Sequence, residues 1–334
     1  PFFALSGKTG RRLWTAQDIG VQIVHKVLTA ESHDLDGDGQ LEVLFIASLD
    51  YGYQLRQSIS THDSQLWMFV CSGQTGTLRW ARPLSFAYNG TPDTFLEVNL
   101  DGTPLSPSVA DINGDGVQDI LVPLAMPNGR ELATSVRSGR DGTELWSRPF
   151  ATDPNRRAAF SDWIPPTVCD LDRDGRVEVV TVESRYVEAT GQPAGRFQEV
   201  SALTGAGGIE LWKSSIEIPT AMQYSQLHRS TEMARAHVLR AGANAQQIAV
   251  LTAGAKDQIS VFDETGARRT WGSSESSPLE GLWICDVDRD GRDDIVTLVH
   301  NKLQALTAAA PSRPLWTHTL DSLGLQRVLG LQAA

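Results

Sequence analysis

The chain has 334 residues, of which 41% are hydrophobic, and this is enough apolar material to bury a sizeable core as one repeat array. Its formal net charge is −11 at pH 7 and its lysines and arginines form no cluster, which argues against nucleic acid or an anionic membrane surface as a partner. The cysteines are too few and too scattered for a disulfide framework or a zinc site, and no apolar run is long enough for membrane insertion.

The first predicted element is a hairpin at residues 5–14, where a Gly-containing turn separates two short strands and the second strand ends in Trp14. The pattern returns along the whole chain at a nearly regular spacing, each time ending in a tryptophan. The later copies occupy residues 72–80, 138–146, 204–212 and 264–271, and a degenerate copy ends at Trp316. Such regularity indicates a structural repeat.

An acidic loop alternates with the hairpins and is first seen at residues 34–42. Its side-chain oxygens fall on positions 1, 3, 5 and 9, position 6 is glycine, and position 7 offers a backbone carbonyl. The candidate ligands are Asp34, Asp36, Asp38, Gln40 and Glu42; Asp111, Asn113, Asp115, Val117 and Asp119; Asp170, Asp172, Asp174, Arg176 and Glu178; and Asp286, Asp288, Asp290, Arg292 and Asp294. Oxygens in this spacing are what calcium requires.

We therefore predict up to four calcium sites, because carboxylates crowded into so short a loop repel one another unless a cation compensates them. An EF-hand is excluded, since position 12 would have to be a bidentate Glu and is Phe45, Val122, Thr181 or Thr297. The alternative of Asp/Gly-rich hairpin turns that hold no metal stays open.

Two departures from the pattern are informative. Asn113 replaces an Asp in the second loop, so we expect weaker binding there. Between Trp212 and Trp271 the acidic loop is replaced by residues 240–247, and we expect this unit to keep its strands and to lose its metal.

Each unit thus reads as a strand, an acidic loop, a second strand, a variable connection and a hairpin closing at Trp. Four antiparallel strands per unit, repeated without helical periodicity, predict an all-β fold, a β-propeller of four-stranded antiparallel blades. We predict a single domain over residues 1–334 with six blades, while seven or eight in a longer parent protein stay open. The expected blades are 15–80, 81–146, 147–212, 213–271, 272–316, and a closing blade from 317–334 plus 1–14. The tryptophans are expected to pack between neighbouring sheets.

The D-x-[DN]-x-D-G-x-x-[DE] loops, flanked by short apolar strands, resemble FG-GAP/VCBS repeats, the calcium-loop propeller repeats of integrin α-chain heads and many bacterial surface proteins. The S-G-x-T-G-x-x-x-W hairpins resemble the outer strands of PQQ-like (quinoprotein-type) propeller repeats. Together these resemblances cover nearly the whole chain. They imply architecture and not activity, because both repeat types occur in enzymes and non-enzymes.

We expect a calcium-binding scaffold or adhesion module without catalytic residues, which binds a protein or glycan. The alternatives are the propeller of a secreted enzyme, either a polysaccharide lyase or a quinoprotein-like dehydrogenase, and the sensor ectodomain of a larger membrane protein. Adjacent cysteines, which would favour the dehydrogenase, are missing from the sequence. Residues outside the repeats such as His62, Asp93, Glu97 and Asp162 suggest no catalytic arrangement.

The long connections between the second and third strands and between successive units should emerge on the face opposite the acidic loops. Residues 85–103 and 152–163 carry several aromatics, so we expect the partner to bind there, with simple loop packing as the alternative. A chain that begins at Pro1, already inside a strand pattern, indicates a fragment of a longer secreted or membrane-anchored protein. We therefore expect an extracellular, cell-surface or periplasmic location.

Overall fold

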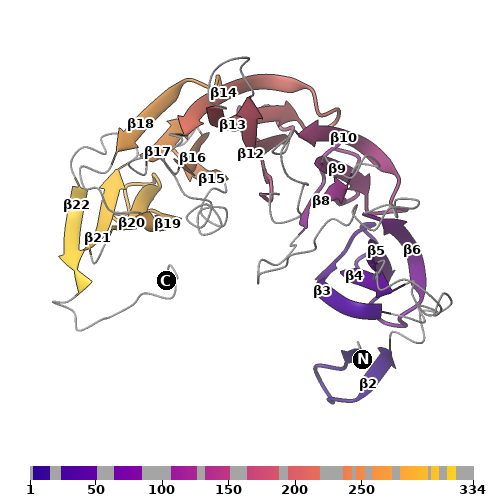
Figure 1. Ribbon diagram of the computed structural model, residues 1–334. Helices are drawn as coiled ribbons and strands as arrows, with labels where there is room; N and C mark the ends of the chain where they lie inside the picture. The colour runs from indigo at the N-terminus through magenta and orange to yellow at the C-terminus, as the bar shows by residue number, and fades with distance from the viewer. Residues whose placement is uncertain are drawn as a thin grey trace, which may run out of the picture. The chain divides into compact units, whose positions relative to one another are not determined.

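The computed structural model describes residues 3–15, 24–50, 64–84, 107–125, 132–150, 164–187, 195–218, 236–242, 246–252, 258–272, 279–299, 302–307 and 314–320. These residues form antiparallel β-sheets (Figure 1). The expected fold class, an all-β propeller of four-stranded antiparallel blades, is confirmed. Within the described ranges, no helix combines the length and apolarity that a membrane span requires.

The described strands make five four-stranded sheets and one two-stranded sheet, so one sheet corresponds to each of the six expected blades. The two-stranded sheet pairs β1 (Phe3–Leu5) with β2 (Arg12–Thr15). Residues 317–334 were expected to complete this sheet, but 317–319 belong to the last strand of the preceding sheet, β22 (Pro314–Thr319), and 321–334 lie outside the described residues.

Blades 1 to 5 are the four-stranded sheets in chain order, and each is a meander in which sequential strands pair. Blade 1 contains β3 (Val24–His33), β4 (Glu42–Asp50), β5 (Ser64–Ser72) and β6 (Leu78–Pro83). Blade 2 contains β7 (Ser108–Ala110), β8 (Asp119–Ala125), β9 (Leu132–Ser138) and β10 (Glu144–Phe150). Blade 3 contains β11 (Thr167–Cys169), β12 (Glu178–Val187), β13 (Gly195–Thr204) and β14 (Glu210–Ile218). Blade 4 contains β15 (Ala236–Arg240), β16 (Gln246–Thr252), β17 (Gln258–Phe262) and β18 (Arg268–Gly272). Blade 5 contains β19 (Leu279–Cys285), β20 (Asp294–Val299), β21 (Lys302–Thr307) and β22 (Pro314–Thr319).

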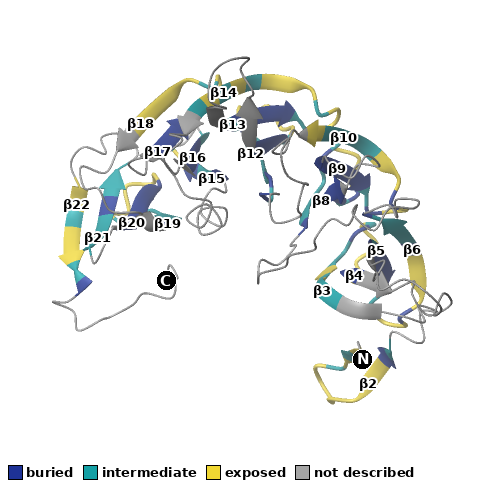
Figure 2. Ribbon diagram, viewed as in Figure 1, coloured by how far each residue is buried: buried dark blue, intermediate teal, exposed yellow. Residues whose placement is uncertain are grey.

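The second strand of a blade is buried on both faces. In β4 the run Leu44, Phe45, Ile46 and Ala47 is fully buried, and Ile120, Leu121 and Val122 of β8 repeat this. A continuous apolar run, in place of an alternating one, is what a strand covered on both sides requires. Figure 2 shows the contrast with the fourth strands, such as β22, where many residues are exposed.

Four of the hairpin tryptophans each pack against a glycine in the hairpin turn of the next sheet. A Cβ added to Gly76 would lie 2.5 Å from Trp14 Cγ, and a Cβ added to Gly142 would lie 2.7 Å from Trp80 Cε3. The same contact joins Gly208 to Trp146 and Gly266 to Trp212. Because only glycine leaves room for the ring, the turn and the tryptophan specify each other. The predicted packing of tryptophans between sheets is confirmed for these four.

The indole N–H groups add a hydrogen bond to this contact. Trp14 Nε1 and Trp80 Nε1 each donate to the carbonyl of a turn glycine in the next sheet, Gly73 and Gly139, over 2.9 Å. Trp212 Nε1 is buried without an acceptor among the described residues, and the turn it faces, residues 263–266, is shorter than the others. The ring packing is therefore more regular than the hydrogen bond.

The chain divides into two compact units. Unit 1 contains Pro1–Pro165 with Ala206–Gly208, and unit 2 contains Pro166–Gly205 with Ile209–Ala334. In unit 1, a core of aliphatic residues from blades 1 and 2, including Leu44, Leu66 and Ile120, joins the two sheets. In unit 2, residues of blades 4 and 5, including Leu239, Ile259 and Ile295, do the same.

Candidate metal sites

The acidic loops connect the first strand of a blade to its second strand, as the sequence predicts. Loop 1 (34–42) joins β3 to β4, loop 2 (111–119) joins β7 to β8, loop 3 (170–178) joins β11 to β12, and loop 5 (286–294) joins β19 to β20. In each loop the acid at position 9 lies opposite the last residue of the first strand. Strand pairing therefore holds both ends of every loop.

Two left-handed residues give these loops a common backbone turn. The glycine at position 6 has φ values of 81°, 82°, 86° and 84° in loops 1, 2, 3 and 5. Position 4 is also left-handed and is Gly37 or Gly114 in loops 1 and 2, but Arg173 or Arg289 in loops 3 and 5. A residue with a Cβ is disfavoured in this conformation, so contacts within loops 3 and 5 must stabilise it.

Backbone N–H groups orient the carboxylates toward the inside of each loop. The Asp at position 1 accepts the N–H of the position 6 glycine over 2.9 Å in loops 1, 2 and 5 and over 3.1 Å in loop 3. The Asp at position 5 accepts the N–H of position 7, which is Gln40, Val117, Arg176 or Arg292. The carbonyls of these four residues remain predicted ligands.

The acid at position 9 is the most deeply buried ligand candidate of each loop. The exposed fractions of Glu42, Asp119, Glu178 and Asp294 are 0%, 0%, 6% and 3%. One oxygen of each accepts the N–H of position 2, over 3.0, 3.1, 2.7 and 3.0 Å respectively. Burial raises the pKa of all four carboxyls, that of Asp119 to about 6, because loss of water disfavours the charged form. A nearby cation would offset that penalty.

Three carboxylate oxygens in the loops are buried without a hydrogen-bond donor among the described residues: Glu42 Oε1 in loop 1, Asp119 Oδ1 in loop 2 and Asp170 Oδ1 in loop 3. Of these, Glu42 Oε1 lies 3.0 Å from a guanidinium nitrogen of Arg79. An unpaired buried acceptor costs about 1–3 kcal/mol, and more if it is charged. A bound metal ion would give the oxygens of Asp119 and Asp170 the positive partner that they lack.

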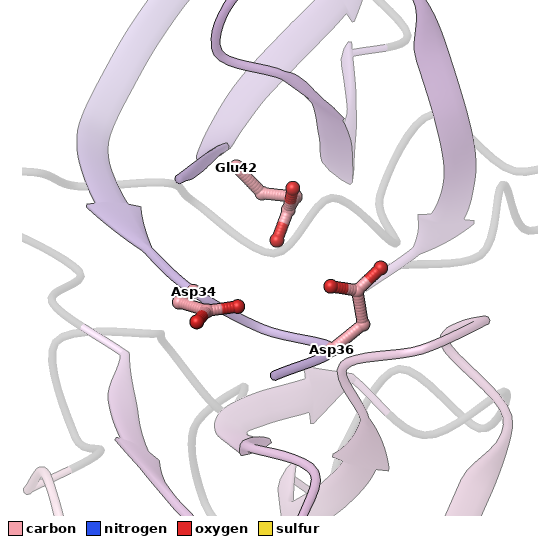
Figure 3. A group of neighbouring side chains, drawn as sticks. All are labelled: Asp34, Asp36 and Glu42. Carbon is pink, nitrogen blue, oxygen red and sulfur yellow. The ribbon is translucent and has the colours of Figure 1, made fainter. Parts of the chain in front are cut away.

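Three of the four loops bring three carboxylates together. In loop 1, oxygens of Asp34, Asp36 and Glu42 lie within 4.8 Å of one another, and Figure 3 shows these side chains around a common space. The corresponding groups are Asp170, Asp172 and Glu178 in loop 3, and Asp286, Asp288 and Asp290 in loop 5. The predicted ligands Asp38, Asp174 and Asp294 belong to the same loops and lie outside these groups.

Loop 2 forms no such group of three acids within the described part of the chain. Asn113 occupies position 3, and its Nδ2 donates to Asp115 Oδ2 over 3.2 Å. The amide thus satisfies one carboxylate without a metal. Loop 2 still has the backbone conformation of the other loops, and its candidate ligands are Asp111, Asn113, Asp115 and Asp119. It therefore has the same loop geometry as the other sites but a smaller negative charge.

Blade 4 has an ion pair near its missing acidic loop. Arg240 ends β15, and its guanidinium donates to both carboxylate oxygens of Asp293 in loop 5 over 2.8 to 3.2 Å. Asp293 also accepts the backbone N–H of Arg240 over 2.8 Å. The blade keeps its first two strands, as predicted, and this pairing links them to blade 5. Residues 243–245 lie outside the described residues.

The carboxylates of loop 1 contact a guanidinium from another part of the blade, which the sequence analysis did not predict. Arg79 on β6 forms an ion pair with Asp36, and its Nη2 lies 3.0 Å from Glu42 Oε1 and 3.7 Å from Asp38 Oδ2. The hairpin repeat did contain a signal for this contact, because Arg79 is a charged residue at a position that is neutral in the other hairpins. The residue before the tryptophan there is Leu13, Leu145, Leu211, Thr270 or Leu315.

The described thiols are poor nucleophiles. Burial raises the pKa of Cys71 and Cys169 to about 12, and it also raises the pKa of Cys285. The connections expected to bind a partner, residues 85–103 and 152–163, lie outside the described residues.

No family model matches the sequence, and no curated protein matches it. Similar solved structures include rhamnogalacturonan lyase YesW, at 16% identity and a TM-score of 0.46, covering 89% of this chain and 61% of that one. BamB from Moraxella catarrhalis has 14% identity and a TM-score of 0.42, covering 92% and 68%. Quinohemoprotein alcohol dehydrogenase from Comamonas testosteroni has 11% identity and a TM-score of 0.44, covering 90% and 44%.

The chain spans 61% of the length of the lyase. At such identities the likeness concerns the β-propeller fold alone, and the PQQ-like nature of the hairpins stays a prediction. Membership of the FG-GAP/VCBS family stays a prediction.

Proposed function

We propose that this chain is a calcium-stabilised β-propeller that serves as a non-catalytic binding or adhesion module for a protein or glycan. The observation that carries the metal part is the buried acid at position 9 in four loops of common backbone geometry, with Asp119 Oδ1 and Asp170 Oδ1 lacking any donor among the described residues. Carboxylates that are buried together are stable as anions only beside a positive charge.

Calcium fits the oxygen donor set better than other common ions. It accepts six to eight oxygen ligands in flexible geometry, whereas magnesium demands a near-ideal octahedron and loses its water reluctantly. Each loop presents carboxylates, an Asn amide in loop 2, and a position 7 carbonyl, with no sulfur or imidazole ligand in the groups of three. When bound, the ion would join position 1 to position 9 and so fix the turn between two strands.

The loop acids suit a scaffold role better than a catalytic one. Their oxygens already accept backbone N–H groups of their own loop, so little capacity is left for a substrate. The extracellular, cell-surface or periplasmic location belongs to this proposal, because extracellular calcium modules work with dissociation constants of about 10⁻⁴ to 10⁻³ M.

A calorimetric calcium titration tests the metal part. Wild type should bind calcium, and Asp172→Asn should lose or weaken one site, because it removes a carboxylate from the loop 3 group. Asp141→Asn is the matched control, since it removes the same charge from a hairpin turn outside the loops. An absence of heat in wild type, or an equal loss in both variants, would contradict the proposal.

The partner part is tested on a glycan array in calcium. On the sequence, the partner should meet residues 85–103 and 152–163, so Tyr88→Ala with Trp163→Ala should abolish binding. Arg173→Glu with Arg292→Glu, which change exposed side chains of acidic loops 3 and 5, should leave it intact. The reverse result, with both variants folded, would place the binding surface on the acidic-loop face.

A further inference from the structure

We propose that Arg79 takes the place of a metal ion in loop 1, so that this loop is closed by an internal cation and the remaining acidic loops bind calcium. Three loop 1 carboxylates contact the guanidinium: Asp36 at position 3, Asp38 at position 5 and Glu42 at position 9. These are positions at which a calcium ion would take its ligands. The inference rests on the proposed calcium binding and divides the four loops into two kinds.

The contact with Glu42 shows what Arg79 supplies. Glu42 is fully buried, and its Oε2 accepts the N–H of Leu35 over 3.0 Å. Its Oε1 makes no hydrogen bond but lies 3.0 Å from Arg79 Nη2. At the same position in loop 2, Asp119 Oδ1 has no donor among the described residues. Loop 1 thus has a built-in positive partner at the point where loop 2 has an uncompensated oxygen.

The position of Arg79 explains how it reaches the loop. It lies on the fourth strand of blade 1 directly before Trp80, whose ring is fixed in the contact with Gly142 of blade 2. The side chain of Arg79 is partly exposed, with 31% of its surface open to solvent, and its guanidinium reaches Asp36 and Glu42 of the loop. Every other hairpin has a neutral residue here, Leu13, Leu145, Leu211, Thr270 or Leu315. At this hairpin position the sequence therefore places a cation in blade 1 alone.

A guanidinium and a calcium ion compete for these oxygens. Both would occupy the space in front of Asp36 and Glu42, and an ion entering there would have to break the Arg79 contacts and then face its positive charge. Loop 1 should therefore fold in the absence of calcium. It should also bind calcium at least about tenfold more weakly than the same loop without Arg79, since one adjacent unit charge is worth that much at partly exposed sites.

The test compares calcium stoichiometry by calorimetry in wild type, Arg79→Leu and Arg82→Leu. Arg79→Leu installs the residue found in most other hairpins, and it should bind one more calcium ion than wild type. Arg82→Leu is the matched control, because Arg82 lies on the same strand and contacts the backbone carbonyls of Asp141 and Gly142. It should leave the number of bound ions unchanged. Equal stoichiometry in all three proteins, with calcium bound elsewhere, would overturn the inference.

A second arm needs no calcium and separates this inference from the proposed function. In chelator, Asp36→Asn should lower the unfolding midpoint of wild type, because it removes a partner of Arg79. In the Arg79→Leu background the same change should raise the midpoint, because it relieves repulsion among uncompensated carboxylates. An effect of the same sign in both backgrounds overturns the role of Arg79. If no protein binds calcium but the sign reverses, the calcium proposal fails and the role of Arg79 stands.

Arg79→Lys covers the case in which Arg79→Leu does not fold in chelator. Lysine keeps the positive charge and loses the planar fork that matches two carboxylates. It should fold, and loop 1 of this variant should bind calcium more tightly than loop 1 of wild type. A lysine variant with the calcium titration of wild type would contradict the competition.

Discussion

At Gly142, the backbone conformation and the packing both require glycine. Its φ is +71°, and an added Cβ would lie within 3 Å of Trp80 and Arg82 side-chain atoms. Gly10 has nearly the same conformation, with a φ of +66°, but no atom lies within 4 Å of its Cβ position. The two glycines therefore separate the cost of the left-handed backbone from the cost of disturbing the tryptophan contact.

We expect Gly10→Ala to cost about 1–2 kcal/mol of unfolding free energy, which is the usual penalty for an L-residue in the left-handed region. Gly142→Ala should cost clearly more, because the Trp80 ring must also move. Urea unfolding of both variants measures the difference. Equal losses would mean that the tryptophan contact contributes little to stability.

Cys71 offers a pH-dependent test of core burial. Burial raises its pKa from 9.0 to about 12, so the fold favours the protonated thiol. This contribution to stability is complete below pH 9 and is lost as pH rises toward 12. At pH 8.5 we expect alkylation of Cys71 to be about a thousandfold slower in the folded protein than in denaturant. Peptide mass spectrometry measures both rates, and similar rates would show that the thiol is accessible.

At the scale of single elements, Arg240 and Asp293 join β15 to loop 5. Asp293 has two partners, the guanidinium of Arg240 and its backbone N–H, and only 7% of it is exposed. The Arg240 side chain is largely exposed. Removing the carboxylate therefore leaves a backbone donor without its acceptor, whereas removing the guanidinium leaves that bond in place.

Asp293→Ala should accordingly lower the thermal unfolding midpoint more than Arg240→Ala does. Arg176→Ala, at an exposed position in loop 3, controls for the loss of an arginine charge and should change the midpoint least. Differential scanning calorimetry provides the comparison. A larger effect of Arg240→Ala would mean that the ion pair, and not the backbone hydrogen bond, stabilises this link.

The strands could be predicted from sequence because recognisable loop and turn motifs mark their ends. The acidic loop ends the first strand and begins the second, and the Gly turn and Trp mark the third and fourth, so the predicted loop 2 lies directly between β7 and β8. The cation that contacts an acidic loop was harder to predict from the sequence. Arg79 follows loop 1 by a whole strand and hairpin, and only the pairing of β4, β5 and β6 brings it near Glu42. Comparison of the hairpins with one another was the signal that could have found it.

At the scale of the whole molecule, charge and stability are coupled through the loops. The net charge of −11 includes the acids of four loops, and each buried position 9 carboxylate is destabilised by burial unless a cation is near. Arg79 meets this need in loop 1. Under the calcium proposal, loops 2, 3 and 5 depend on an added ion for the same compensation, and blade 4 depends on none.

The most direct test is therefore the thermal unfolding midpoint of the intact chain in calcium, in magnesium and in chelator. Calcium at a hundredfold excess over its dissociation constant should stabilise the fold by about 2.7 kcal/mol per site. The midpoint should rise in calcium, fall back in chelator, and rise much less in magnesium. A midpoint that is the same in calcium and in chelator would contradict calcium binding and would leave the acidic loops as turns that hold no metal.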